Sequence, residues 1–352
     1  MILSYLILEG LIFHSGLYDR YLETSSSTGI FERTYLHEKK RKPQAPDEVL
    51  VVGDSRIGEG FSSKIASAAC SDHGYYFANV AIAGTTPRSW YYLLRDLDPT
   101  RKRYRAIVLP VPSYDDIDDF EDLQDWRPDI HYCIMRLRYS DAYEFPLSFQ
   151  QPRRRLEAIR VVLFKGIVLQ SDLLAFFEHF HRRLANIEQF QANWWGSVNA
   201  YEGHSEDLAQ LQVDWEKNTI RFPETLPPNV REKIRQDAFG PYAAQTGALG
   251  RYYKQWFGKI LDLYRNSDTS VVFLALPRGP AVPPKSLIQP VSHVIRDMAQ
   301  KPGVILLPEN SFVSLERGDF YFDSMHLNAR GRVQFSEMLA QLIRRTLGPS
   351  RN

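Results

Sequence analysis

Two short stretches, far apart in the chain, carry the residue types of a serine-dependent acyl-transfer site. Ser55 follows the apolar run Val49–Val52 and Gly53, where a buried strand is expected to end in a turn. Asp323 and His326 lie near the other end of the chain. A serine hydroxyl is a weak nucleophile that needs a base to take its proton and a third group to orient that base. The pattern predicts Ser55 as nucleophile, His326 as base and Asp323 as the orienting carboxylate.

The local structure at each end must bring these residues together. A tight turn over Phe322–Leu327 would point the Asp323 and His326 side chains the same way. Asn328 can cap a helix directly behind this turn, and Gly348 can stop that helix. The turn and the final helix are therefore expected to position the base.

The elements between these ends alternate between strands and helices. Short apolar runs rich in β-branched residues predict strands, and apolar residues at helical spacing behind Ser62 or Thr86-Pro87 predict helices. The expected strands are Val49–Val52, Tyr76–Ile82, Ala106–Val111, Val271–Leu276 and Val304–Leu307. Such alternation predicts an α/β fold with a parallel sheet of about five strands.

A break in the alternation predicts a large insertion. We expect an α/β domain over residues 48–350, interrupted by a mainly helical insertion at about 115–265. Within it, Arg155–Leu184 has apolar residues at helical period and is predicted to form one amphipathic helix. Its apolar face would pack on the core, or on a membrane or partner protein.

Residues 1–47 are predicted to be an anchor-like segment followed by a linker. Met1–Phe13 is apolar except for Ser4, Glu9 and Gly10, which is too short for a membrane span and lacks signal-peptide features. It is interpreted either as a buried or interfacial helix, or as the outer end of a signal anchor that starts upstream. Phe31–Asp47 is charged and contains Pro, which favours a linker or surface strap.

Composition excludes several classes of function. The net charge of +1 gives no basis for nucleic-acid binding. Two cysteines, Cys70 and Cys133, exclude a disulfide-dense scaffold and a cysteine-based zinc site. The acidic stretch Asp115–Asp129 is interpreted as a solvated loop rather than a calcium site. No metal and no cofactor are expected.

The motifs resemble those of the SGNH (GDSL-like) hydrolase superfamily. The resemblance is carried by Gly53-Asp54-Ser55 after the first strand, Gly84 after the second, and Asp323-x-x-His326 before the final helix. It covers about 55–105 and about 270–345 and implies a flavodoxin-like three-layer fold. It also implies the roles already given to the Ser, His and Asp, with the Ser55 backbone N–H and Gly84 as oxyanion donors.

The chain departs from the SGNH pattern in the third block. That block usually supplies an Asn donor, as Gly-x-Asn-Asp, whereas this chain reads Pro110-Val111-Pro112-Ser113-Tyr114. Ser113, Arg278 from the Pro-Arg-Gly-Pro loop, and Arg56 beside the nucleophile are candidate replacements.

This divergent pattern resembles the membrane-anchored bacterial branch linked to polysaccharide O-acetylation and teichoic acid D-alanylation. The resemblance implies a serine-dependent O-acyltransferase or esterase that acts on acyl esters, acetyl foremost, of cell-envelope or exported polysaccharide. It further implies an acyl-Ser55 intermediate, a membrane-bound O-acyltransferase as partner, and an extracytoplasmic site of action on the bacterial envelope.

Two alternatives stay open at this point. The missing third-block Asn would suit a non-catalytic SGNH-like scaffold that binds polysaccharide or a membrane acyltransferase. A cytosolic lipase or thioesterase would fit if Met1 is the true start. The sequence also does not distinguish transfer of the acyl group to a sugar from its hydrolysis.

Overall fold

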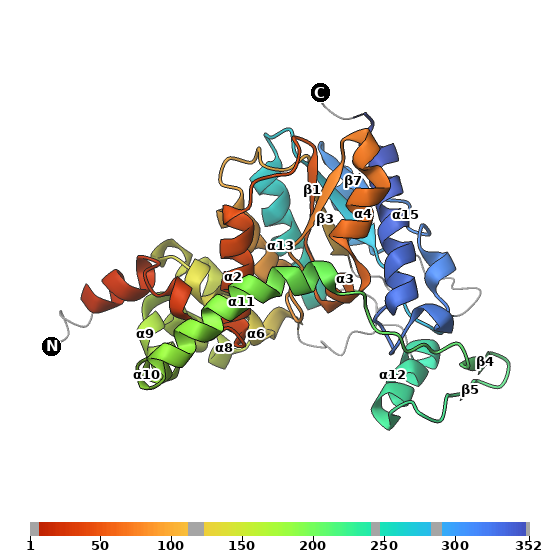
Figure 1. Cartoon of the computed structure of the whole chain (residues 1–352), viewed down its shortest axis with the longest axis horizontal. Helices are drawn as coiled ribbons and strands as arrows, with labels where there is room; N and C mark the ends of the chain where they lie inside the picture. Colours follow the sequence, from red (N-terminus) through yellow and green to blue (C-terminus); the bar gives the residue numbers. More distant parts are fainter. Residues whose placement is uncertain (1–6, 112–122, 241–246, 283–290, 350–352) are drawn as a thin grey trace. The chain divides into compact units, whose positions relative to one another are not determined.

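The computed structural model describes residues 7–111, 123–240, 247–282 and 291–349 (Figure 1). The chain divides into two compact units. Unit 1 is drawn from Met1–Lys42, Gly84–Pro99 and Phe120–Ala200, and unit 2 from Pro43–Ala83, Thr100–Asp119 and Tyr201–Asn352.

Unit 2 is built on a five-stranded parallel sheet with the order β2-β1-β3-β6-β7. The α/β fold and the five strands predicted from the sequence are confirmed. β1 pairs Val51 with Asn79 of β2 and with Val108 of β3. The strands are β1 (Glu48–Val51), β2 (Tyr76–Asn79), β3 (Ala106–Val111), β6 (Ser270–Ala275) and β7 (Val304–Leu306).

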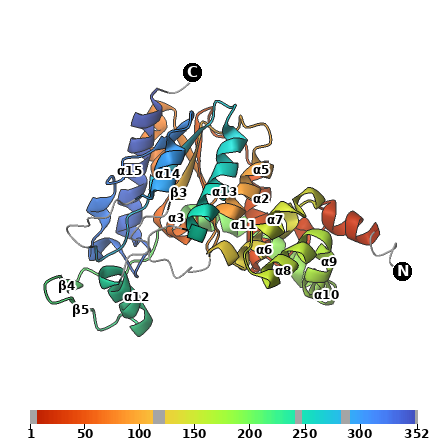
Figure 2. The ribbon, with the colours of Figure 1, turned by 180° about the vertical axis from the view of Figure 1, so that it is seen from behind.

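Helices cover both faces of this sheet (Figures 1 and 2). On one face, α4 (Ser63–Cys70) and α15 (Ala329–Leu347) share a buried core with side chains of β1, β3 and β6. On the other face, Phe257 of α13 (Gly247–Tyr264) packs edge-on against Phe273 of β6, and α14 (His293–Ala299) packs beside α13 and β7. Alternate strand residues therefore face two different helical layers.

The predicted helix starts in unit 2 are confirmed by their caps. The Ser62 hydroxyl accepts a hydrogen bond from the Ile65 N–H, and the Asn328 side chain accepts one from the Gly331 N–H at 3.0 Å. Gly348, with φ of 76°, ends α15 as expected.

Within the predicted helical insertion, unit 2 also contains a short antiparallel hairpin that the sequence did not indicate. It pairs β4 (Gln212–Asp214) with β5 (Thr219–Arg221) and precedes α12 (Pro228–Phe239). The remaining short helices of unit 2 are α3 (Ser55–Gly60), η3 (Ser71–His73), η7 (Val313–Leu315) and η8 (Gly318–Phe320).

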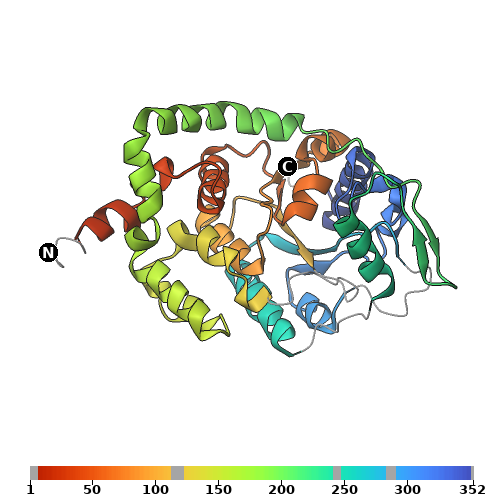
Figure 3. The ribbon, with the colours of Figure 1, turned by 90° about the horizontal axis from the view of Figure 1, so that it is seen from below.

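All the regular elements among the described residues of unit 1 are helices (Figure 3). Its predicted helix α5 (Pro87–Leu97) begins with a capping box between Thr86 and Ser89, as expected. The other helices are η1 (Glu9–His14), η2 (Asp19–Tyr21), α2 (Ser27–Lys40), η4 (Leu123–Asp125), α6 (Pro128–Cys133), η5 (Ile134–Arg136), η6 (Tyr139–Asp141), α7 (Glu144–Leu147), α8 (Pro152–Leu163), α9 (Lys165–Val168), α10 (Gln170–Glu178) and α11 (Phe180–Ala200).

Two predictions for unit 1 are wrong. The expected single helix over Arg155–Leu184 is split into α8, α9, α10 and the start of α11, because Phe164, Leu169 and His179 leave helical geometry. The predicted linker Phe31–Asp47 includes residues 31–40 of α2, a helix that the Ser26 side chain caps and that buries most of its first two turns. Packing within unit 1 outweighed the apolar period in the first case and the charge pattern in the second.

None of the helices in the described ranges is both long and apolar enough to cross a bilayer. Residues Met1–Leu6, part of the apolar N-terminal segment, lie outside those ranges.

Candidate active site

β1 runs into a turn that presents Ser55. Gly53 has no room for a side chain, because an added Cβ would lie 2.5 Å from Ile57 Cγ1. The Asp54 carboxylate accepts a hydrogen bond from the Arg56 backbone N–H at 2.9 Å and caps α3. Ser55 is therefore the first residue of α3, half-buried, just beyond the carboxyl end of β1.

The strand order gives this position a general significance. β1 lies between β2 and β3, so the chain leaves β1 toward one side of the sheet and later returns on the other. In open parallel sheets, ligands bind outside the carboxyl ends of the strands at such a reversal. Ser55 thus lies where the fold itself favours a substrate site.

The loop that carries Asp323 and His326 is closed at both ends. Tyr321 and Leu327 form an antiparallel bridge, and the Phe322 N–H donates to the His326 carbonyl at 3.2 Å. The predicted tight turn over Phe322–Leu327 is confirmed. Because α15 begins directly behind it, the loop is attached to a helix of the core.

Ser55, His326 and Asp323 form one hydrogen-bonded chain. His326 Nε2 lies 2.8 Å from Ser55 Oγ, and His326 Nδ1 lies 2.7 Å from Asp323 Oδ2. An ionised carboxylate can only accept, so the Nδ1–H of a neutral imidazole donates to Asp323 and Nε2 faces the serine with its lone pair. This is the arrangement in which the imidazole can accept the serine proton.

Asp323 is held in its charged form. Burial by itself raises the pKa of Asp323, but hydrogen bonds from the His326 ring and from the backbone N–H groups of Met325 and His326 outweigh burial and leave this pKa below its ordinary value. The carboxylate is therefore ionised at neutral pH, as the tautomer argument requires.

An aromatic wall next to the imidazole was missed by the sequence analysis. The Phe322 ring stacks on His326 with a centroid distance of 5.7 Å and an interplanar angle of 16°. The His204 ring stacks on the same Phe322 ring, with a centroid distance of 3.8 Å. The His204 backbone carbonyl accepts a hydrogen bond from the Ala329 N–H at 2.7 Å. The position of Phe322 next to Asp323 was the one available signal, whereas His204 is too distant in sequence to be found.

Two predicted oxyanion residues cannot be placed at the triad. Gly84 belongs to unit 1, where its carbonyl accepts a hydrogen bond from Trp126 Nε1 at 2.9 Å. Its φ of 74° suits glycine, and a Cβ there would lie 3.1 Å from the Tyr132 hydroxyl. Ser113 lies outside the described residues. The oxyanion roles of both residues stay predictions.

The two candidate arginines are engaged by carboxylates. Arg56 Nη2 lies 3.3 Å from Asp54 Oδ2. Arg278 donates from Nε to Glu316 Oε1 at 2.9 Å and from Nη2 to Oε2 at 2.7 Å, a bidentate ion pair. Nothing in the sequence indicated Glu316, because it lies in a different loop.

The Arg278 loop nevertheless lies against the triad loop. A Cβ added to Gly279 would lie 3.1 Å from the Ser324 carbonyl oxygen, so the two backbones are in close contact. Arg278 therefore belongs to the surroundings of the triad, and its role as an oxyanion donor stays a prediction.

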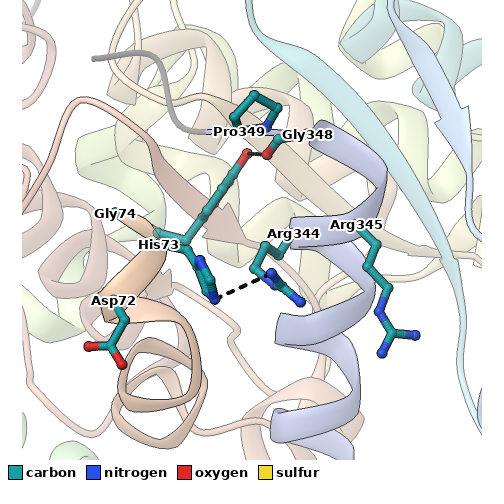
Figure 4. A pocket seen from close by; sticks show the side chains of 8 residues that line it. Asp72, His73, Gly74, Arg344, Arg345, Gly348 and Pro349 are labelled. Carbon is teal, nitrogen blue, oxygen red and sulfur yellow. Dashed lines mark hydrogen bonds between the residues drawn. The ribbon is translucent and has the colours of Figure 1, made fainter.

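A pocket of about 590 Å³ occurs elsewhere in unit 2 (Figure 4). It lies between η3 and the end of α15, and Arg344 Nη1 donates to His73 Nε2 at 3.3 Å across it. Tyr75, which also lines it, directly precedes β2. The pocket is therefore at the amino edge of the parallel sheet, opposite the edge where Ser55 lies.

The described side chains offer little for metal or thiol chemistry. Within the described ranges, no group of three or more His, Cys, Asp or Glu could hold a metal ion. Cys70 and Cys133 are both free and buried, and burial raises the pKa of each thiol. Neither cysteine therefore competes with Ser55 as a nucleophile.

Comparison with known proteins adds no relative. No protein-family model matches the chain, and no curated protein matches it. The resemblance to SGNH hydrolases therefore rests on the motifs of this chain alone.

Proposed function

We propose that this protein is an SGNH-type serine esterase or O-acyltransferase in which Ser55, His326 and Asp323 are the catalytic triad. The observation that carries the proposal is the hydrogen-bonded chain through His326, with distances of 2.8 Å and 2.7 Å. The strand order supports the finer fold assignment, because it corresponds to the 2-1-3-4-5 order of flavodoxin-like sheets.

The reaction proceeds through an acyl-enzyme. His326 Nε2 takes the proton of Ser55 while Oγ attacks the acyl carbon. The tetrahedral intermediate then releases the alcohol, whose oxygen receives that proton from His326. A sugar hydroxyl or water next attacks the acyl-Ser55 ester, giving its proton to His326, and the proton returns to Ser55 Oγ as the new ester or acid leaves.

The developing oxyanion needs donors, each contributing about 3–4 kcal/mol in acyl-transfer enzymes. The Ser55 backbone N–H is one proposed donor, since it lies at the start of α3. Gly84 is the second, and Ser113, Arg56 or Arg278 would replace the missing Asn.

We further propose that the substrate is an acyl ester, acetyl foremost, of cell-envelope or exported polysaccharide. A membrane-bound O-acyltransferase is the proposed partner, and the bacterial envelope outside the cytoplasm is the proposed location, with the N-terminal hydrophobic segment as anchor. These points rest on the resemblance to the membrane-anchored branch.

Labelling with a fluorophosphonate tests the triad. We expect the intact mass of the wild type to increase by one phosphonyl group and that of Ser55→Ala to stay unchanged. Ser63→Ala is the matched control, because Ser63 is also the first residue of a helix in unit 2. An unlabelled wild type would contradict the proposal. It would favour the non-catalytic scaffold, which the missing third-block Asn suggests.

Transfer and hydrolysis are separated by a second measurement. If the enzyme is a transferase, consumption of a chromogenic acetyl ester should accelerate with added glycan, and the acetyl group should appear on the glycan. Rapid hydrolysis that is independent of glycan would instead identify an esterase.

A further inference from the structure

Unit 1 exposes large apolar side chains on adjoining elements. Among the described residues, most of the exposed large apolar side chains belong to unit 1, whereas unit 2 exposes Val313 and Val333. We define an apolar cap by six side chains, each more than half exposed, on or beside η1, α9 and α10: Leu8, Leu11, Leu17, Ile167, Leu174 and Phe177. α9 contacts both η1 and α10 (Figures 1 and 3).

Hydrogen bonds and close packing hold the elements of the cap together. The Glu9 carboxylate of η1 accepts a hydrogen bond from the Gly166 N–H of α9 at 3.0 Å. A Cβ on Gly166 would lie 2.7 Å from the Phe13 ring, so η1 and α9 are packed closely. The Tyr18 hydroxyl donates to Asp172 of α10 at 2.6 Å. The apolar side chains therefore project from an ordered, hydrogen-bonded base.

These elements bury charged side chains beside the apolar Phe13 and Phe176, and they leave other large apolar side chains exposed. Glu9 and Lys165 are almost fully buried, while Leu11 is 61% and Phe177 68% exposed. Exposing apolar side chains to water is unfavourable, and contiguous exposed apolar surface marks an interaction site. The face is thus built to meet an apolar phase.

The charges around the cap favour an anionic partner. Arg20, Arg160 and Arg182 are exposed on η2, α8 and α11, against the exposed Glu178 of α10 and Glu188 of α11. α8 contacts α9, α11 contacts α10, and Tyr21 of η2 packs on Phe176 of α10, so all three elements adjoin the cap. Apolar side chains flanked by arginines are typical of helices that lie in the interface of a bilayer with anionic lipids. A purely apolar protein partner would leave these arginines without a counterpart.

The sequence before the cap continues the apolar character. The first eight residues read MILSYLIL and contain no charged side chain. We propose that the apolar cap of unit 1 inserts into the interface of a bilayer containing anionic lipids. This inference does not depend on the Ser55 chemistry and would hold for the scaffold alternative as well.

Vesicle flotation of the full chain tests the inference. We expect wild type to float with vesicles of phosphatidylcholine and phosphatidylglycerol. The double variant Leu11→Gln with Phe177→Gln should have a vesicle affinity at least about tenfold lower. Val313→Gln is the matched control, since Val313 is 44% exposed in unit 2, and it should bind like wild type. The thermal midpoint and the far-UV circular dichroism spectrum report separately that the variants fold.

The arginines are tested with the same vesicles. Arg160→Gln with Arg182→Gln should weaken binding several-fold to vesicles containing phosphatidylglycerol and leave binding to pure phosphatidylcholine unchanged. The inference is overturned if wild type fails to float, or if the Leu11 and Phe177 variant floats like wild type. It is also overturned if light scattering shows a dimer that this variant abolishes while vesicles bind neither protein, because the cap would then be an interface between copies.

Discussion

The two units hold their carboxylates in opposite settings. In unit 1, Asp129 is completely buried and lies 3.2 Å from the equally buried Arg88. In unit 2, a quarter of the Asp323 side chain is exposed, and it is directed at His326. Burial raises the pKa of Asp129 to about 6 although Arg88 and the Thr86 hydroxyl lower it, whereas the donors around Asp323 outweigh burial.

This difference distinguishes a carboxylate that serves packing, Asp129, from one that is placed to orient a base, Asp323. Complete burial makes a carboxylate costly to ionise even beside an arginine. A partly exposed carboxylate with donors on both oxygens stays ionised and can orient a base. Substitutions in the two settings should therefore differ in whether they affect catalysis or stability.

Asp323→Asn should lower kcat/KM for an acetyl ester by about 10³–10⁴-fold, because the amide would favour the wrong tautomer of His326. The free energy of unfolding should change by about 1 kcal/mol or less, since the pair is partly exposed. Asp319→Asn, an acid of the neighbouring η8 that pairs with Arg317, is the control and should retain wild-type kcat/KM. Equal losses of kcat/KM in both variants would contradict the orienting role of Asp323.

Arg88→Ala should reduce the free energy of unfolding by about 3–5 kcal/mol, because it leaves Asp129 buried without its partner. The guanidinium also lies over the Phe149 ring at 3.8 Å, so packing is lost too. The exposed pair of Arg235 and Glu232 is the comparison, and Arg235→Ala should cost under about 1 kcal/mol in urea unfolding. Similar costs would mean that burial does not distinguish the pairs.

Asp129→Asn should flatten the pH dependence of stability. The folded pKa of Asp129, about 6, lies above its unfolded value of 3.8. The stabilisation from the protonated carboxyl is therefore present below about pH 4 and lost as the pH rises through about 6, a change of about 2–3 kcal/mol. Urea unfolding at acidic and neutral pH measures it, and parallel profiles for wild type and variant would refute this assignment.

Phe322→Ala should lower kcat/KM by about 2–10-fold, the size expected for one aromatic contact. The ring acts through the orientation of His326, so kcat should fall more than KM rises. Phe322→Tyr keeps the ring and should restore most of the activity. A loss confined to KM would instead place Phe322 in substrate binding.

Much of unit 2 was predictable because its signals are local. Four of the five strands contain β-branched residues, β2 begins with two aromatic residues, and Ser62 and Asn328 cap the helices expected of them. Unit 1 was less predictable. α2 lies in a charged stretch that resembles a linker, and its helix is stabilised by burial of Phe31 and Tyr35, which no local pattern reports.

The sequence by itself determined the residue types at Ser55, Asp323 and His326, the strand that precedes the serine, and the turn and helix that hold the histidine. Only the tertiary structure decided that Ser55 Oγ and His326 Nε2 lie 2.8 Å apart, that Glu316 binds Arg278, and that the apolar cap is exposed. The physical reason is one of range. Propensities and caps act over a few residues, whereas these contacts depend on how the sheet, α15 and the helices of unit 1 pack their side chains.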